Sequence, residues 1–234
     1  MLHCRYSRPS LAGSLVLVPL LLAAAPAGPG DKAQGDHRHH GGHHSFQDAA
    51  AWAKHFESPE RAKWQKPDLV VDLLQHAPTH RVADIGSGTG YFAARIAREV
   101  AKGRVWGVDI EPDMVRFLNQ RARREKLPNL FSVLGTPADP LLPEQVDRII
   151  LVDTYHHIDA RVAYFRALRQ QLRPGGRLVV VDFKRGDLPV GPPDAMKLSA
   201  AQVEAELVQA GYRRHQLEPK LLPYQYVLVM EPAA

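Results

Sequence analysis

A glycine-rich turn between two acidic residues is the first part of the sequence with the residue types and spacing to do chemistry. Asp84 ends an apolar run, and Asp109 ends a second one about 20 positions beyond the turn. The turn itself contributes four candidate binding residues: Gly86, Ser87, Gly88 and Gly90. Glycine lets the backbone bend sharply and lets a ligand lie against the main chain, because no β-carbon intervenes. Asp84 repels a pyrophosphate and attracts a cation, while the two oxygens of Asp109 suit ribose hydroxyls. Together they predict a binding site for a nucleoside that carries a positive charge.

The same turn argues against two commoner nucleotide sites. A dinucleotide fingerprint requires its third glycine where this chain has Tyr91, and no Lys-Ser or Lys-Thr pair follows to make a phosphate loop. A nicotinamide dehydrogenase is therefore disfavoured. Two plainer interpretations stay open, namely that the glycines serve only to turn the chain and that Asp109 is a solvated loop acid.

A second group of polar residues follows another apolar run, Val146 to Val152. It contains one acid, one tyrosine and two histidines: Asp153, Tyr155, His156 and His157. We expect Asp153 to contact the cofactor, Tyr155 to shape a cavity, and His156 or His157 to act as a base near neutral pH. The alternative is structural, with one imidazole packed under the next helix and the other bonded to the backbone.

These residues must be positioned by alternating strands and helices. We expect five strands, at 81–85, 104–110, 130–134, 146–152 and 177–183, and helices from about 89, over 113–126, over 159–172 and over 199–210. Strands that alternate with helices predict right-handed crossovers and a mostly parallel sheet. Two more candidate strands, 212–217 and 224–230, are joined by a connection too short for a crossover helix, which predicts an antiparallel hairpin at one edge. The expected fold is a doubly wound α/β domain with seven strands.

Helical spacing also covers residues 46–76, with Ser58 as N-cap, Pro59 at the first helical position and Pro67 dividing the segment. We take 46–234 as one domain that includes these helices. Aromatic and histidine side chains in these helices, together with the loop 184–197, are candidates for recognising the substrate. The side chains are Trp52, His55, Phe56 and Trp64. The alternative for such residues is ordinary core packing. Lys184 and Arg185 either meet an anionic substrate or are simply solvated.

Four blocks in order resemble the class I S-adenosylmethionine-dependent methyltransferases. Within that family, the sequence is similar to quinone-biosynthesis and other small-molecule methyltransferases. The four blocks are 82–90, 107–115, 147–152 and 172–183. The resemblance implies S-adenosylmethionine as cofactor, a small-molecule methyl acceptor, the turn around the methionine part, and Asp109 with Ile110 at the ribose. The family often has an adenine-binding acid after the third strand, where this chain has Thr136 and Pro137. Asp139 takes that role or is a plain turn residue.

The first 45 residues have a different character. Two arginines, an apolar run of 15 residues and Ala25-Pro26-Ala27 predict a cleaved signal peptide over 1–27, with no permanent membrane span and an exported, periplasmic or secreted protein. The formal charge of +5 is too small to indicate nucleic acid, and Cys4 alone builds no disulfide or zinc site.

Residues 28–45 are expected to form a flexible linker with five histidines: His37, His39, His40, His43 and His44. Imidazole binds transition metals, but the glycines between these residues fix no geometry, so we expect at most weak binding. A polar spacer is the plainer interpretation. An exported, non-catalytic cofactor- or metal-binding protein is the alternative to an enzyme.

Overall fold

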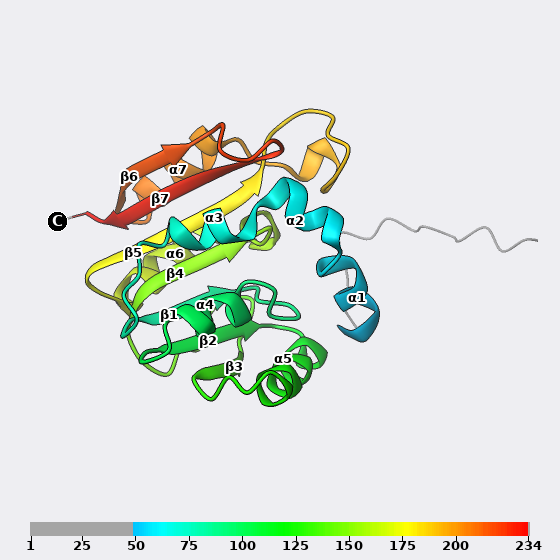
Figure 1. Cartoon of the computed structure of the whole chain (residues 1–234). Coiled ribbons are helices and arrows are strands. Elements are labelled where there is room, and N and C mark those ends of the chain that lie inside the picture. The colour runs from blue at the N-terminus through cyan, green and yellow to red at the C-terminus, as the bar shows by residue number, and fades with distance from the viewer. Residues whose placement is uncertain (1–48, 234) are drawn as a thin grey trace, which may run out of the picture. The chain divides into compact units, whose positions relative to one another are not determined.

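Seven strands form a single sheet in the computed structural model, which describes residues 49–233 (Figure 1). The order across the sheet is β3-β2-β1-β4-β5-β7-β6. The strands are β1 (Arg81–Ile85), β2 (Arg104–Asp109), β3 (Leu130–Leu134), β4 (Val146–Val152), β5 (Leu172–Phe183), β6 (Tyr212–Glu218) and β7 (Gln225–Pro232). The first five are parallel, and β7 runs antiparallel between β5 and β6. The predicted doubly wound sheet with its C-terminal antiparallel pair is confirmed.

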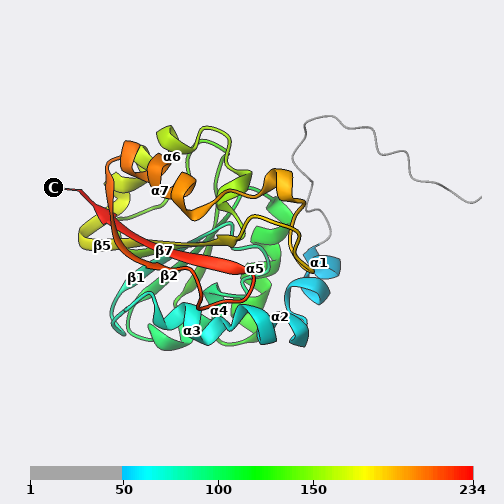
Figure 2. The same ribbon diagram turned by 90° about the horizontal axis from the view of Figure 1, so that it is seen from above.

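Helices cover both faces of this sheet, as the view from above shows (Figure 2). One face packs against α3 (Pro67–Asp72), α4 (Ala93–Glu99) and α5 (Pro112–Arg124), and the other against α6 (Arg161–Leu168) and α7 (Ala200–Gln209). Central strands such as β4 are buried on both faces, which is why they read as unbroken apolar runs. The parallel strands therefore end together at one edge, where the predicted site residues meet.

The amino-terminal helices reach this edge, and their boundaries follow local rules. The helix α1 (Ala49–Phe56) is followed by α2 (Pro59–Gln65), whose N-cap Ser58 accepts a hydrogen bond from the N–H of Arg61. Lys66 takes a left-handed conformation and ends α2, and Pro67 begins α3. The predicted cap and the division at Pro67 are confirmed. Figure 1 shows α2 beside the ends of β4 and β5.

Three predicted boundaries were wrong. The helix expected from about residue 89 begins at Ala93, because the three glycines at 86, 88 and 90 all have positive φ and the turn continues through Phe92. The helix expected to run to residue 172 ends at Leu168 and is followed by a short 3₁₀ turn. The strand β5 then begins at Leu172, and its register with β4 is shifted before Arg177, where we expected it to start.

The predicted signal peptide, linker and histidine cluster lie outside the described residues. The 49–233 segment belongs to one compact unit, and it contains no helix that is long and apolar enough to span a membrane. The short 3₁₀ turns η1 (Tyr155–His157), η2 (Arg169–Gln171) and η3 (Asp194–Met196) complete its elements.

Candidate functional site

The glycine turn folds back onto the end of β2. The backbone N–H groups of Gly86 and Ser87 both donate to the carbonyl of Val108, at 2.8 and 2.9 Å. The N–H of Gly88 donates to Oδ2 of Asp109 at 2.8 Å. The predicted turn and the predicted ribose-binding acid are thus in direct contact, although they are separated by 21 positions in the sequence.

Packing gives one reason for glycine in this turn. Gly86 has a φ of +73°, and a β-carbon there would lie 2.3 Å from Oγ1 of Thr154, at the end of the neighbouring strand β4. At Gly88 a β-carbon would meet only the ring of Phe56, at 3.5 Å. Close approach between two strand ends therefore requires Gly86, whether or not a ligand is bound.

Asp84 and Asp109 are acids whose ionised forms are disfavoured by burial. Asp84 is 3% exposed, and burial raises its pKa to about 7, although a hydrogen bond from the N–H of Ala93 opposes this. Burial also raises the pKa of Asp109, against hydrogen bonds from the N–H groups of Glu111 and Gly88. A cation bound nearby would favour the ionised form of both carboxylates, which is the property expected of a cationic nucleoside site.

Asp153 is held by three side chains that the sequence analysis missed. Its φ is +56°, an uncommon conformation for aspartate, and its oxygens accept hydrogen bonds from Gln65, at 3.1 Å, and from Gln225. The guanidinium of Arg61 lies 3.5 Å from Oδ2. Burial raises the pKa of Asp153 to about 6, and Arg61 acts against this rise. Asp153, which was predicted to contact the cofactor, therefore also anchors α2. Its three partners are far from it in the sequence and meet it only in the folded protein.

His156 is buried against Asp182, at the ends of β4 and β5. Its Nδ1 lies 2.9 and 3.0 Å from the two carboxylate oxygens, and the two side chains are 3% and 1% exposed. Burial disfavours the imidazolium, but the hydrogen bond and charge of Asp182 outweigh it and raise the pKa of His156. The ring of His157 lies over that of His156, with centroids 4.2 Å apart. Asp182 was missed, although an acid at a strand end is the signal that identified Asp84 and Asp109.

Three other predicted site residues lie apart from this group. Tyr155 is fully buried, stacks on Phe165, and donates its hydroxyl to Glu206 at 2.9 Å. It belongs to the core between the sheet and α7 rather than to a cavity wall, contrary to the prediction. Asp139 is exposed, and its Oδ1 accepts a hydrogen bond from the N–H of Leu141, which is the turn role. Ile110 is 44% exposed next to Asp109.

The aromatic residues of the amino-terminal helices divide between two places. Trp52 and Phe56 stack on one another, and Phe56 faces the glycine turn at Gly88. Trp64 packs near Phe183, with ring centroids 5.8 Å apart. Lys184 donates to backbone carbonyls at 222 and 223, and Arg185 pairs with Asp194, so both are engaged within the chain rather than aimed at an anion.

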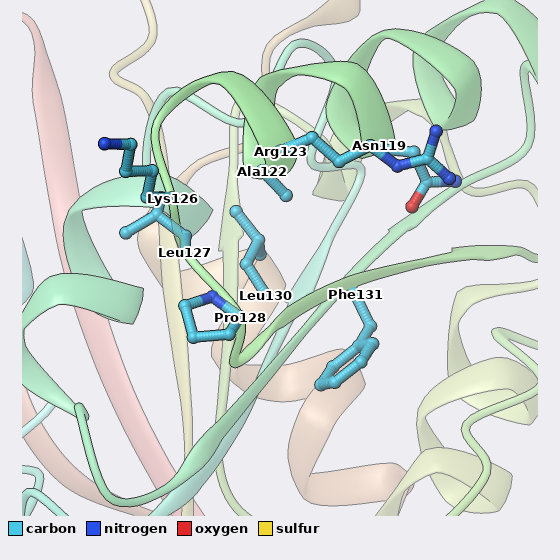
Figure 3. A pocket seen from close by; sticks show the side chains of 8 residues that line it. All are labelled: Asn119, Ala122, Arg123, Lys126, Leu127, Pro128, Leu130 and Phe131. Carbon is cyan, nitrogen blue, oxygen red and sulfur yellow. The ribbon is translucent and has the colours of Figure 1, made fainter.

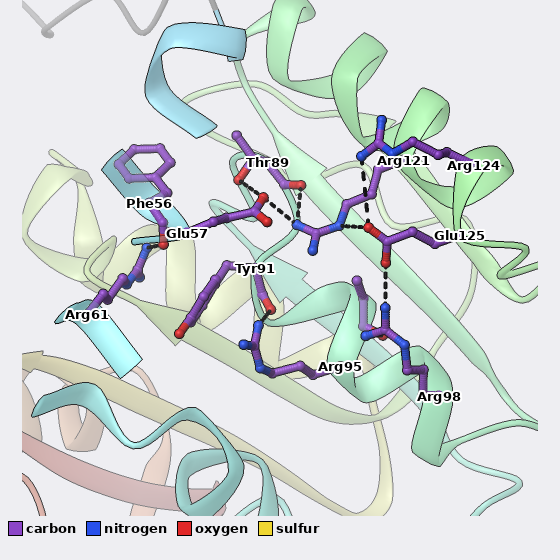
Figure 4. A network of polar contacts seen from close by, with 11 residues as sticks. Phe56, Glu57, Arg61, Thr89, Tyr91, Arg95, Arg98, Arg121, Arg124 and Glu125 are labelled. Atoms are coloured by element: carbon purple, nitrogen blue, oxygen red, sulfur yellow. Dashed lines mark hydrogen bonds and ion pairs between the residues drawn. The ribbon is translucent and has the colours of Figure 1, made fainter. Parts of the chain in front are cut away.

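A polar network fastens α1 and α2 to the turn (Figure 4). Buried Arg121 of α5 donates to Glu57, at 2.6 Å, and to the carbonyl of Thr89, at 3.1 Å. The hydroxyl of Thr89 donates to the same carboxylate, and Arg121 also pairs with Glu125. The connection between α1 and α2 is thereby held directly over the glycine turn.

Buried polar atoms at the turn fit a bound nucleoside. The hydroxyls of Ser87 and Tyr91 are buried and have no hydrogen-bond partner within residues 49–233. No group of three metal-binding side chains occurs in this part of the chain. A surface hollow of about 570 Å³ lies elsewhere, between the end of α5 and the start of β3, and includes none of the predicted site residues (Figure 3).

The comparisons with known proteins agree with this geometry. A family described as "Methyltransferase domain" matches residues 83–180. An uncharacterized methyltransferase of Mycobacterium tuberculosis is 36% identical over 124 residues, 52% of this chain and 47% of that protein. The crystal structure of a SAM-dependent methyltransferase from Aquifex aeolicus superposes with a TM-score of 0.72 at 22% identity, covering 78% of this chain and 97% of that one. Magnesium protoporphyrin IX methyltransferase of Synechocystis, solved with bound SAM, gives 0.62 at 18% identity, covering 81% and 93%.

The likeness covers the fold and the glycine turn together. The chain spans about half the length of the curated relatives it matches. These curated relatives are named as methyltransferases, while the finer likeness to quinone-biosynthesis enzymes stays a prediction. The sheet order, the turn with its two acids and the family match agree: residues 83–180 are similar to a methyltransferase domain, and the chain has the fold of solved SAM-dependent methyltransferases.

Proposed function

We propose that this protein uses S-adenosylmethionine to methylate an O–H or N–H group of a small molecule, with His156 as the base. The observation that carries the proposal is the buried His156–Asp182 pair, which lies at the same sheet edge as the glycine turn. An acceptor that begins protonated requires a base, and imidazole suits that role near neutral pH.

The residues of the turn and the strand ends would hold the cofactor. Asp109 keeps acceptor capacity for the ribose hydroxyls, and the turn from Gly86 to Gly90 offers a close approach to the main chain. Asp84 and Asp153 provide negative charge for the cationic end. When bound, S-adenosylmethionine supplies the methyl group as an electrophile.

Asp182 orients His156 and stabilises its charged form. A proton on Nδ1 is held by the carboxylate, which leaves the lone pair of Nε2 to take the proton of the acceptor. The imidazolium that results is stabilised by the same carboxylate. Because the pKa of His156 is raised above its usual 6.5, the neutral base forms only at higher pH. The reaction rate should therefore rise with pH through that raised pKa.

The test is His156→Asn, assayed by release of S-adenosylhomocysteine with a panel of phenols, amines, carboxylic acids and thiols. We expect kcat on phenols or amines to fall about 100- to 10,000-fold, the usual contribution of a general base, while the Kd for S-adenosylhomocysteine changes less than threefold. His215→Asn, on β6, is the matched control. His157→Asn separates the two adjacent histidines, and a larger loss there would move the base to His157.

Asp182→Asn tests the positioning role by a different readout. Removing the carboxylate should lower the pKa of His156 and move the rising limb of the pH–rate profile to lower pH, with a reduced plateau. An unchanged profile, or full activity of His156→Asn on every acceptor class, would remove the pair from the chemistry. The class of acceptor is decided by the same panel.

Export is a separate part of the proposal, supported by the sequence pattern of residues 1–27. Amino-terminal sequencing of protein from the native host should find a chain that begins near Gly28. Intact Met1 in a cytosolic fraction would contradict export. Titration of Ni²⁺ or Zn²⁺ into the full chain and into a chain lacking residues 28–45 tests the weak metal binding expected of the five histidines.

A further inference from the structure

Tyr226 of β7 is a buried tyrosine whose hydroxyl has no hydrogen-bond partner within residues 49–233. The side chain is 2% exposed and belongs to the core between the sheet and the helices α6 and α7. A buried hydroxyl without a partner destabilises a fold, whereas phenylalanine would fill the same space without that penalty. Packing therefore accounts for the ring of Tyr226 and not for its oxygen.

Tyr226 lies directly opposite the acid of the His156–Asp182 pair. The strands β5 and β7 are antiparallel, and their register pairs Asp182 with Tyr226. Directly opposed residues of neighbouring strands project from the same face of the sheet, with β-carbons about 4.5 to 5.5 Å apart. Asp182 is fully buried, so little water separates the two side chains. The unused hydroxyl is thus placed beside the proposed catalytic pair.

The hydroxyl of Tyr226 keeps its proton at neutral pH. Burial raises the pKa of Tyr226 above its usual value of 10, and among the neighbouring charges that of Asp182 raises it most, ahead of Tyr155 and Glu206. The group is therefore a neutral donor that meets negative charge on its polar side. Its proton is attracted to a carboxylate, and two carboxylates are candidates.

The two carboxylates differ in how fully they are used. Glu206 accepts hydrogen bonds from Arg161, at 2.6 and 3.1 Å, and from Tyr155, at 2.9 Å. Among the described residues, the carboxylate of Asp182 contacts the Nδ1 of His156 and accepts from the backbone N–H of the next residue, at 2.7 Å. Asp182 has the larger spare acceptor capacity and is not held by an arginine. The hydroxyl proton is therefore directed at Asp182.

A donor directed at Asp182 changes the protonation of His156. The hydrogen bond and the charge of Asp182 raise the pKa of His156. The hydroxyl of Tyr226 presents the positive end of its dipole to the same pair, and a positive potential disfavours the imidazolium. The hydroxyl thus opposes part of the effect of Asp182, and the neutral imidazole forms at a lower pH than it would beside the carboxylate alone.

Other charged and titratable groups also surround this pair. They are Asp153, Tyr155 and His157 beside the end of β4, Arg161 of α6 and Glu206 of α7. Asp153 raises the pKa of His156, and Arg161 lowers it. Because Tyr226→Phe leaves all of these groups in place, a change in the titration of His156 in that variant reports the hydroxyl.

We propose that Tyr226 is a positioning residue of the His156–Asp182 pair, whose hydroxyl is directed at the carboxylate and keeps more of His156 in the neutral form that accepts a proton. The coupling between these residues exists in the free protein, while its consequence for the reaction rests on the proposed function. Tyr226 lies in β7, outside the matched residues 83–180. The proposal also explains why a hydroxyl that weakens the fold stands at this position.

The experiment follows two pH titrations of the full chain and of Tyr226→Phe. NMR with labelled histidine follows the imidazole of His156 in the free protein, and His156→Asn identifies its resonance. Initial rates give the pH–rate profile with the acceptor found in the panel. We expect Tyr226→Phe to move the His156 titration and the rising limb of the profile to higher pH, by about half a pH unit, the effect of one hydrogen bond. Asp182→Asn should move both to lower pH, so the two variants have opposite signs.

Tyr212→Phe is the matched control. Tyr212 is a buried tyrosine of the neighbouring strand β6, and its hydroxyl donates to the carbonyl of Phe165 at 3.0 Å. Loss of that bond should lower the thermal midpoint and leave the titration of His156 in place. Tyr226→Phe should show the reverse pattern, with a thermal midpoint that is unchanged or higher and a titration that moves.

The two titrations separate the proposal from the proposed function. An unchanged His156 titration in Tyr226→Phe, or one that moves to lower pH, would overturn the proposal whatever the reaction is. An equal shift in Tyr212→Phe would overturn it too, because the effect would then be one of general packing. A shift of the His156 titration with an unchanged rate profile would support the coupling and show that another group is the base, so the proposed function alone would fail.

Discussion

The two halves of the sheet edge are built in different ways. At β1 and β2 the site is made by neighbouring residues of one segment, where backbone N–H groups of the turn bond to Val108 and Asp109. At β4 and β5 it is made by side chains that come from far apart. Gln65 and Gln225 reach Asp153 across 88 and 72 positions, and Asp182 reaches His156 across 26. The first half is specified by local sequence, and the second by tertiary packing.

The largest effect expected at the first half is on stability. Gly86→Ala places a β-carbon against Thr154 in a backbone conformation that disfavours it, so we expect the free energy of unfolding to fall by about 3 kcal/mol or more. Gly88→Ala shares the positive φ but meets only the ring of Phe56, and should cost about 1 kcal/mol. Urea denaturation measures both. Equal losses would show that contact between the strand ends does not dictate Gly86.

The next effect concerns binding. Asp109→Ala removes the acceptor for Gly88 and for Glu111, as well as the proposed ribose contact. We expect affinity for S-adenosylhomocysteine to weaken by about 1–3 kcal/mol, the cost of leaving such partners unpaired. Glu111→Gln is the control, because it changes a neighbouring charge and leaves the backbone bonds in place. Calorimetry that gives an unchanged Kd for Asp109→Ala would place the ribose elsewhere.

Much of the fold could be predicted because its signals are local. Buried parallel strands are apolar runs, Ser58 and Pro67 mark helix ends, and the glycines with Asp84 and Asp109 lie within one β-α-β unit. The ends of the turn were misjudged because Tyr91 and Phe92 have helical composition and yet lie in the continuing turn. Arg61, Gln65 and Gln225 carry no local signal, since each gains its role only when α2 and β7 pack beside Asp153.

A pH series tests both halves with one ligand. The pKa values of Asp84, about 7, and Asp153, about 6, are raised by burial above the ordinary value near 4. The folded protein therefore holds protons that the unfolded chain has lost, so the unfolding free energy of the free protein should fall as pH rises from about 4 through 7.

Binding of a cation needs the ionised acids, so affinity for S-adenosylmethionine should rise about tenfold or more over pH 5.5 to 8. The thermal shift produced by this ligand should grow with pH. A shift that shrinks instead would mean that neither acid faces the ligand's positive charge.

The smallest effect separates the two roles left open for Asp139. Its side chain bonds the N–H of Leu141 and its backbone bonds Thr136, all on an exposed turn, where water can replace a lost acceptor. Asp139→Ala should therefore cost less than about 1 kcal/mol of stability and change the Kd for S-adenosylhomocysteine less than twofold. The Kd for adenosine should change by the same small factor as the Kd for S-adenosylhomocysteine, because both ligands carry the adenine end. If the variant instead weakens both ligands tenfold, Asp139 contacts the adenine, and the local pattern that places Asp84 and Asp109 extends to the third strand of the same half.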